Sequence, residues 1–363
     1  MQRQAFIDWM KATGMFAIVV GHIIGSPYHI FNLVSQPIYT KQLGVCFFIF
    51  IMGWSLAHEK SNSFQVVFKR AFPIYFYGAL FAILMSAYNY YNVGNLNESN
   101  YLPFFLGANV LFNFFPANPT TWYIGTYLHV LLFWFLFMRN RQIGLGHVGI
   151  AIIIEIVVRA SLIYQDLDFV AYMTLPNWLT IFVLGSYLHQ KKDTSFTLST
   201  VLMLVAWAAL LALWASPLNN LIAPKSFPFR EISNVENLHT WGPSFARSVL
   251  ISFIYILNTI VFFELLRRVP YNKVVGFFAR NSLITFIVHM PLIYATNKFF
   301  YNTFETAWVA QWLMIAFIFI GCALISEVFN KIINLSYLQT KAWSIWTLIF
   351  GRFIKETANQ NKN

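Results

Sequence analysis

The sequence predicts an all-α fold, a polytopic bundle of transmembrane helices. Of the 363 residues, 58% are apolar or aromatic and only 10% are charged, whereas a soluble domain carries about 25% charged residues. The apolar residues gather into runs of about 20, long enough to cross roughly 30 Å of hydrocarbon as helices. The net charge of +11 is spread over the short connections between these runs, which excludes the single basic patch of a nucleic-acid-binding protein.

About ten such runs can be delimited by length and composition. They lie near residues 6–26, 42–58, 71–88, 121–138, 147–164, 169–188, 197–216, 245–266, 276–297 and 307–335. A further apolar stretch, residues 102–115, is too short to cross and contains Pro103, so we interpret it as a re-entrant or interfacial segment. We therefore divide the chain into a transmembrane domain, residues 1–340, and a tail, residues 341–363.

Connections rich in lysine and arginine alternate along the chain with connections that hold few, and this asymmetry predicts the orientation of the protein in the membrane. One side holds Arg3, then Lys60, Lys69 and Arg70, then Arg139 and Arg141, then Lys191 and Lys192, then Arg267, Arg268 and Lys273, and finally the basic residues of the tail. The opposite connections hold Lys41, Lys225 and Arg230, with Lys298 at one edge, and the long connection over residues 89–121 holds none. Because cytoplasmic loops are enriched in Lys and Arg, we expect both termini and the tail to be cytoplasmic, in a multi-pass protein of the cell (inner) membrane.

The first predicted helix carries three ionisable residues, Asp8, Lys11 and His22. From Lys11 to His22, steps of about 100° end about 20° past three full turns, so the two side chains share one helix face. They are separated by about 16 Å along the axis, and Asp8, one turn before Lys11, can pair with it. Ionisable groups at membrane depth usually face protein or a water-filled cavity and often serve function. This face therefore predicts a functional site, with a packing role of His22 as the alternative.

Other polar residues fall in or beside the predicted spans. Lys69 and Arg70 begin the third span on the side of Lys11. They are either membrane anchors or, with Lys11, a site for a phosphate-bearing ligand from the cytoplasm. Glu155 and Arg159 stand four residues apart, so they either neutralise each other or belong to a site.

The cysteine residues, Cys46 and Cys322, both lie in apolar runs. They offer neither a disulfide framework nor a zinc site, and we expect no metal.

The residues of the first helix form a pattern that resembles the acyltransferase-3 family of integral membrane acyltransferases. That family opens with Asp-x-x-Arg/Lys followed by His, similar to Asp8, Lys11 and His22. Its second span carries a Gly-Val-x-x-Phe-Phe…Ser-Gly pattern, similar to residues 44–53, where Met52 replaces the usual Ser.

The resemblance continues along most of the chain. A late family pattern with Ser…His-x-Pro-Leu is similar to Ser282 through His289 to residue 292, and Trp122 resembles a family helix start. The chain departs from the family where an Arg-x-x-Arg pattern is usual, because Pro73 stands at the second arginine position after Arg70.

The resemblance implies transfer of an acyl group, usually acetyl, from cytoplasmic acyl-CoA to a hydroxyl of a cell-surface or lipid-linked carbohydrate. It implies that Lys11, Lys69 and Arg70 bind the donor, and that His22, with Asp8 and Lys11, is catalytic, either as general base or as acyl carrier. Candidates for the acceptor side, or for positions behind it, are His289, Ser282, Trp122, Glu155 and Arg159. Acetyl-CoA is then a co-substrate, and no permanently bound cofactor is implied.

Two other functions fit the composition. About ten spans with buried charges and proline-broken helices also suit a transporter or exporter of a glycan or small solute. An inactive sensor that retains the fold is the third class, favoured by Pro73 and Met52. Labelled acetyl-CoA separates the three, because only an enzyme moves the label onto carbohydrate.

Overall fold

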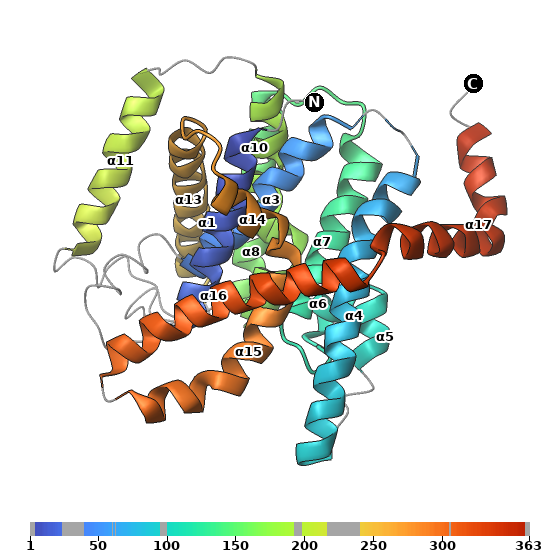
Figure 1. Cartoon of the computed structure of the whole chain (residues 1–363). Coiled ribbons are helices and arrows are strands. Elements are labelled where there is room, and N and C mark those ends of the chain that lie inside the picture. The colour runs from blue at the N-terminus through green and yellow to red at the C-terminus, as the bar shows by residue number, and fades with distance from the viewer. Residues whose placement is uncertain are drawn as a thin grey trace.

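The computed structural model describes residues 4–23, 40–59, 61, 63–94, 100–191, 198–215, 240–304 and 306–359, and within these ranges the chain forms helices and no strand (Figure 1). In chain order the helices are α1 (Ala5–Ile23), α3 (Thr40–Ala57), α4 (Gln65–Val93), α5 (Tyr101–Phe105), α6 (Asn109–Phe112), α7 (Thr121–Phe133), the π-helix η2 (Trp134–Met138), α8 (Leu145–Tyr164), α9 (Asp168–Met173), the 3-10 helix η3 (Leu175–Trp178), α10 (Leu179–Gln190), α11 (Leu198–Ala215), α13 (Trp241–Leu266), α14 (Lys273–Arg280), α15 (Ser282–Thr303), α16 (Ala307–Ile332) and α17 (Leu335–Asn359).

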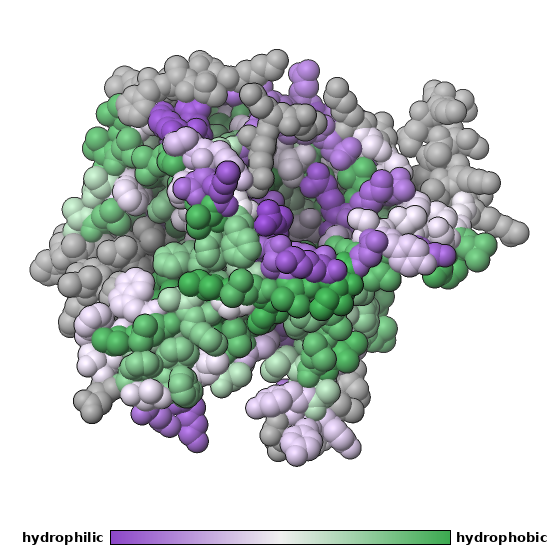
Figure 2. Space-filling model, viewed as in Figure 1, coloured by the Kyte–Doolittle hydropathy of each residue, from purple (hydrophilic) through white to green (hydrophobic). Residues whose placement is uncertain are grey.

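Among the described residues, seven helices are long and apolar enough to cross a membrane: α1, α4, α7 with η2, α8, α13, α15 and α16. The apolar helices within α3 and α11 are shorter. Hydrophobic residues form a broad band across the face shown in Figure 2, and hydrophilic residues gather above it and at its lower tips. The prediction of an all-α multi-pass membrane protein is confirmed, while the count of about ten spans and the orientation stay predictions.

Several predicted segments differ in detail from the observed helices. The expected helix over residues 169–188 is divided into α9, η3 and α10, because Thr174 is extended and Pro176 in η3 lacks an N–H for a continuous helix. The expected helix over residues 276–297 is divided at Asn281, between α14 and α15. The apolar stretch over residues 102–115 forms only the short helices α5 and α6, as expected for a segment that does not cross.

The centre of the bundle depends on very close contacts between α1, α3 and α10. A Cβ atom on Gly44 of α3 would lie 2.3 Å from the carbonyl oxygen of Gly14 in α1. A Cβ atom on Gly185 of α10 would lie 2.2 Å from the carbonyl oxygen of Phe50 in α3. Glycine at these crossings lets helix backbones touch, as small residues do in membrane bundles. The packing fixes α1, and with it Lys11 and His22, against the second span.

Candidate functional site

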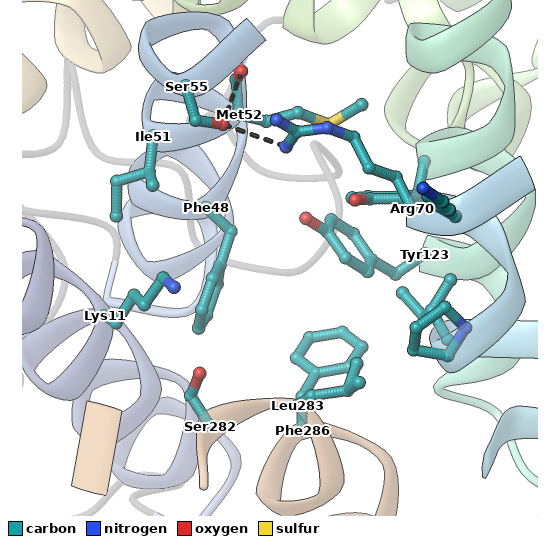
Figure 3. Close-up of a pocket in the computed structure, with 14 residues that line it drawn as sticks. Lys11, Phe48, Ile51, Met52, Ser55, Arg70, Tyr123, Ser282, Leu283 and Phe286 are labelled. Atoms are coloured by element: carbon teal, nitrogen blue, oxygen red, sulfur yellow. Dashed lines mark hydrogen bonds between the residues drawn. The ribbon is translucent and has the colours of Figure 1, made fainter. Parts of the chain in front are cut away.

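A cavity of about 300 Å³ opens between α1, α3, α4, α7 and α15, and basic residues line it. Lys11 lines it from α1 and Arg70 from the second turn of α4 (Figure 3). Lys69, the neighbour of Arg70, also lines it. Its walls also include Ser282 of α15 and the aromatic rings of Phe48, Tyr123 and Phe286. We call this volume the cationic cavity. It brings together all three predicted donor-binding residues, which come from two helices.

The guanidinium of Arg70 is oriented by α3. Its Nη1 atom donates to Ser55 Oγ at 3.1 Å, and Ser55 in turn donates to the carbonyl oxygen of Met52 (Figure 3). The second contact, from Arg70 Nη2 to Glu59 Oε2, is 4.0 Å long, and both side chains are more than a quarter exposed. A long, exposed ion pair stabilises little, so an anionic ligand can displace Glu59 from Arg70.

Pro73 lies in the wall of the cationic cavity. The Arg-x-x-Arg pattern described above has its second arginine at this position. With proline there instead, this wall holds one cation fewer than the pattern would give. On α4, the cavity then keeps Lys69 and Arg70 as its basic residues.

A second cavity, of about 390 Å³, contains two histidine side chains. His22 comes from α1 and His289 from α15, and their ring centroids are 5.1 Å apart. Trp122, Tyr172 and Thr120 are among the other lining residues. We call this volume the imidazole cavity. It joins His22, His289 and Trp122, three predicted site residues that are far apart in the sequence.

Both imidazole rings contact backbone carbonyls through Nδ1. His22 Nδ1 lies 2.8 Å from the oxygen of Ile18, and His289 Nδ1 lies 2.6 Å from the oxygen of Phe286. A carbonyl oxygen only accepts, so each Nδ1 must carry the hydrogen, and in the neutral ring Nε2 then holds the lone pair. His289 is 1% exposed, and its Nε2 has no hydrogen-bond partner among the described residues. Each ring is therefore set in the tautomer that can take a proton at Nε2.

The segment before α7, which lines the imidazole cavity, is hydrogen bonded to a backbone carbonyl of α15 that has no partner within its own helix. Pro291 lies inside α15 and has no N–H, so the oxygen of Ile287, four residues earlier, lacks its helical partner. Asn118 Nδ2 donates to this oxygen at 2.9 Å and Thr120 Oγ1 at 3.3 Å. The turn before α7, which carries Thr120 and leads into Trp122, is thereby held against the helix that carries His289.

Phe286 separates the two cavities and lines both of them. Its ring is 5% exposed, and its centroid lies 4.8 Å from that of Tyr123 and 6.3 Å from that of Phe48. The His289 ring lies 5.8 Å away on the other side. Lys11 and His22, at opposite parts of α1, thus reach two volumes that meet at one phenylalanine.

Three predicted residues line neither cavity. Asp8 is buried in α1, 8% exposed, one turn before Lys11. Glu155 and Arg159 are completely buried in α8, where Arg159 Nη1 lies 3.2 Å from Glu155 Oε1. Of the two readings of this pair, the structure supports mutual neutralisation.

The Glu155–Arg159 pair is the centre of a saturated hydrogen-bond network between α8, η3 and α13. The partners of Arg159 are Glu155, the Asn177 Oδ1 atom, the hydroxyl and carbonyl of Ser248, and the hydroxyl of Ser252. All five guanidinium N–H groups are therefore used. Asn177 also donates to the oxygen of Tyr172 at 3.1 Å, and Tyr172 lines the imidazole cavity. The network supports the cavity from behind.

Sequence reasoning missed Ser55, Asn118, Thr120 and Phe286. The signal for Asn118 and Thr120 was indirect: Pro291 predicts an orphaned carbonyl at Ile287, but not which distant loop supplies the donor. Phe286 is one of 39 phenylalanines, and nothing in the sequence distinguishes it from lipid-facing ones. Across the described ranges, no group of three or more His, Cys, Asp or Glu side chains could hold a metal ion.

The fold and the two cavities define a multi-pass helical membrane protein with two neighbouring cavities, one lined in part by basic residues and one by two histidines. The family model of the acyltransferase-3 type, described as an acyltransferase domain, matches residues 4–327. The chain belongs to this family of acyltransferases, which confirms the resemblance seen in the sequence. Comparisons with curated proteins and with solved structures found no match.

Proposed function

We propose that this protein is an O-acyltransferase of the cell membrane that moves an acetyl or other acyl group from cytoplasmic acyl-CoA to a carbohydrate hydroxyl. The carbohydrate is a cell-surface or lipid-linked one. The observation that carries the proposal is the meeting of a cationic and an imidazole cavity at Phe286. Such an arrangement suits two substrates that enter from different sides and react at the boundary.

The cationic cavity suits the donor. Acyl-CoA carries phosphates at one end and its thioester at the other, and Lys11, Lys69 and Arg70 offer charge-assisted hydrogen bonds to phosphate oxygens. Arginine gives a planar, bidentate contact and lysine a compact charge. In this proposal the positive-inside distribution places these residues toward the cytoplasm, where the phosphates stay while the thin acyl-bearing arm reaches past Phe286.

The imidazole cavity suits the acceptor and the chemistry. A carbohydrate hydroxyl is a poor nucleophile at neutral pH, and an imidazole is the natural general base. His22 Nε2 takes the hydroxyl proton while the oxygen attacks the thioester carbonyl; the carbon–sulfur bond breaks, and the leaving thiolate receives the proton. The products are the ester and free CoA. In the alternative course, His22 Nε2 attacks the thioester, the carbon–sulfur bond breaks and CoA thiolate leaves; the hydroxyl then takes the acyl group from His22, and its proton goes to the thiolate.

His289 and Trp122 complete the acceptor side. The Nε2 atom of His289 is a buried acceptor without a partner among the described residues, so a sugar hydroxyl that donates to it removes an unfavourable desolvation. The Trp122 ring lines the same cavity and offers a flat apolar face to a sugar ring. Ser282, on the donor side of Phe286, can hydrogen bond the arm of the donor.

The test is transfer of radiolabelled acetyl from acetyl-CoA by membranes that contain the protein, with the label followed into lipid-linked and polysaccharide fractions. We expect label in carbohydrate ester, released by mild alkali, and no label with His22→Ala. Export of glycan without label transfer would instead support the transporter class. Absence of both would support an inactive, sensor-like member of the family.

A further inference from the structure

Helix α17 lies outside the matched acyltransferase domain, which ends at residue 327. It begins directly after α16, its first half contacts the N-terminal part of α4, and the helix then extends to one side of the bundle (Figure 1). That part of α4 carries Lys69 and Arg70. Helix α17 is thus an element outside the matched domain that contacts the part of α4 beside the cationic cavity.

Gln339 of α17 donates a hydrogen bond to a backbone carbonyl of α4 that has no partner within its own helix. Pro73 lies inside α4 and has no N–H, so the carbonyl oxygen of Lys69, four residues earlier, has no helical partner. Gln339 Nε2 donates to this oxygen at 2.7 Å. Pro73 therefore leaves free the carbonyl oxygen to which Gln339 donates. This oxygen belongs to Lys69, which lines the cationic cavity.

Aromatic rings reinforce the contact, between later residues of α17 and residues that precede Lys69 in α4. The Trp343 ring lies 5.0 Å from the Phe68 ring, and the Trp346 ring stacks on the Phe64 ring at 6.0 Å and 22°. Phe64 and Phe68 flank the first turn of α4. The residues of α17 that face α4 recur at positions 339, 343 and 346, which is one helix stripe.

The remaining circumference of α17 has two different faces. One is polar and contains Ser336, Thr340 and Ser344, successive at four-residue spacing. The other carries the apolar side chains of Ile345, Leu348 and Ile349, which are 58%, 86% and 63% exposed, with Lys341 on the same face. From Lys341 onward the sequence adds Lys341, Arg352, Lys355 and Lys362 against the single acid Glu356. A helix with a polar face, an exposed apolar face and a basic excess is suited to the headgroup region of an anionic membrane.

We propose that α17 is an in-plane helix in the headgroup region of an anionic membrane. Its apolar face points toward the acyl chains, and the stripe of Gln339, Trp343 and Trp346 holds the N-terminal turns of α4. Gln339 is the positioning residue of this contact, because it fixes the carbonyl of Lys69 beside the cationic cavity. The part that concerns the donor rests on the proposed acyl-CoA function. The lipid contact and the Gln339–Lys69 contact stand without it.

A double-mutant cycle tests the contact with α4, using Gln339→Ala, Pro73→Ala and both together in the full-length protein. Gln339→Ala alone should lower the melting temperature in detergent and raise the KM for acetyl-CoA roughly two- to tenfold, the equivalent of one net hydrogen bond, with kcat unchanged. In the Pro73→Ala background, residue 73 regains an N–H for Lys69, so the further change Gln339→Ala should have no effect. Ser344→Ala, on the polar face of α17, is the matched control.

Equal effects of Gln339→Ala in both backgrounds would overturn the proposed pairing with Pro73. A lower melting temperature with unchanged KM would reduce Gln339 to a structural contact and overturn its positioning role. If the wild-type protein transfers no acyl group at all, the proposed function fails, while the melting-temperature cycle still decides the contact.

Spin labels test the lipid contact. Single substitutions Ile345→Cys, Leu348→Cys, Thr340→Cys and Ser344→Cys are labelled in a background where the native Cys46 and Cys322 are buried. In vesicles of phosphatidylcholine with phosphatidylglycerol, the first two labels should meet oxygen and be shielded from a nickel chelate, and the last two should meet the chelate. This difference should shrink in phosphatidylcholine alone. Four labels that all meet the chelate equally in both vesicles would overturn the proposal.

Discussion

The imidazole rings of His22 and His289 lie 5.1 Å apart, although one belongs to the first helix of the chain and the other to α15. Each ring is held through Nδ1 by a carbonyl of its own helix. Both side chains line one cavity. In the proposed mechanism the pair, rather than His22 alone, is therefore the chemical centre.

Removal of either imidazole should reduce turnover without preventing insertion. Because a general base contributes about 10²- to 10⁴-fold, we expect His22→Ala to lower kcat by that order, and His289→Ala by less. The double variant should be no worse than about the product of the two, as single-turnover transfer of labelled acetyl will show. His147→Ala, at the exposed start of α8, is the control; near-native turnover of His22→Ala would contradict the catalytic role.

Loss of a cation from the cationic cavity should weaken donor binding. Lys11→Ala and Arg70→Ala remove a contact made equally in ground and transition states, so the KM for acyl-CoA should rise with little change in kcat. The rise should be roughly tenfold, since charge-assisted hydrogen bonds contribute about 1.5–3 kcal/mol before solvent screening. Steady-state kinetics over a donor titration measures this. A fall in kcat at saturating donor with an unchanged KM would assign these residues elsewhere.

Phe286 should set the size of the acyl group that passes between the cavities. Phe286→Ala opens the boundary, and a pocket discriminates about 1–3 kcal/mol per methylene. The ratio of kcat/KM for butyryl-CoA to that for acetyl-CoA should therefore rise roughly tenfold or more. Phe253→Ala, on the exposed side of α13 (48% exposed), should leave the ratio unchanged. The idea fails if both variants keep the wild-type ratio.

The Glu155–Arg159 pair should matter for stability more than for chemistry. Arg159→Met leaves a buried carboxylate without its partner, which should destabilise the protein by about 3–5 kcal/mol. Arg280→Met removes a pair of 3.6 Å with Glu327, both partly exposed, and should change stability by about 1 kcal/mol or less. Thermal unfolding in detergent compares the two. Equal melting temperatures would contradict the central place of the Arg159 network.

Orientation can be tested with impermeant thiol reagents on intact cells. The distribution of basic residues predicts that Asn97→Cys and Asn234→Cys react from outside, while Gln142→Cys and Asn272→Cys react only after permeabilisation. The native Cys46 and Cys322 are buried, so background labelling should be low. Asn97 and Asn234 lie outside the described residues, and the expectation for them rests on charge alone. The reverse labelling pattern would place Lys11 on a side without acyl-CoA.

The sequence predicted the membrane class well, because burial in lipid leaves a strong signal in every apolar run. Helix α8, expected over residues 147–164, is observed at Leu145–Tyr164. The break at Thr174 was missed although Pro176 follows it two residues later. The break at Asn281 was not predicted, since it depends on contacts with another helix. Asn281, for example, is fully buried and bonded to Ser326 and Glu327 of α16.

The site was predictable where one helix carries it, and less so where helices meet. The spacing of Lys11 and His22 on α1 was sufficient to select both residues. Their division between two cavities was not, because it depends on Phe286 of α15. Glu155 and Arg159 remained ambiguous in sequence, since only the structure shows that Ser248 and Ser252 of α13 complete their bonding.

The carbonyl of Ile287 has a consequence for how relatives of this chain can diverge. Pro291 leaves that oxygen atom without a helical donor, and Asn118 supplies one. A substitution at either position therefore changes what the other position requires. A relative that loses the proline regains a backbone donor there and no longer needs an amide before α7. A relative that keeps the proline must retain a donor at the position of Asn118 or Thr120. An alignment of the family should therefore show these distant positions changing together, and the loop's distance from α15 in the sequence should not weaken that correlation.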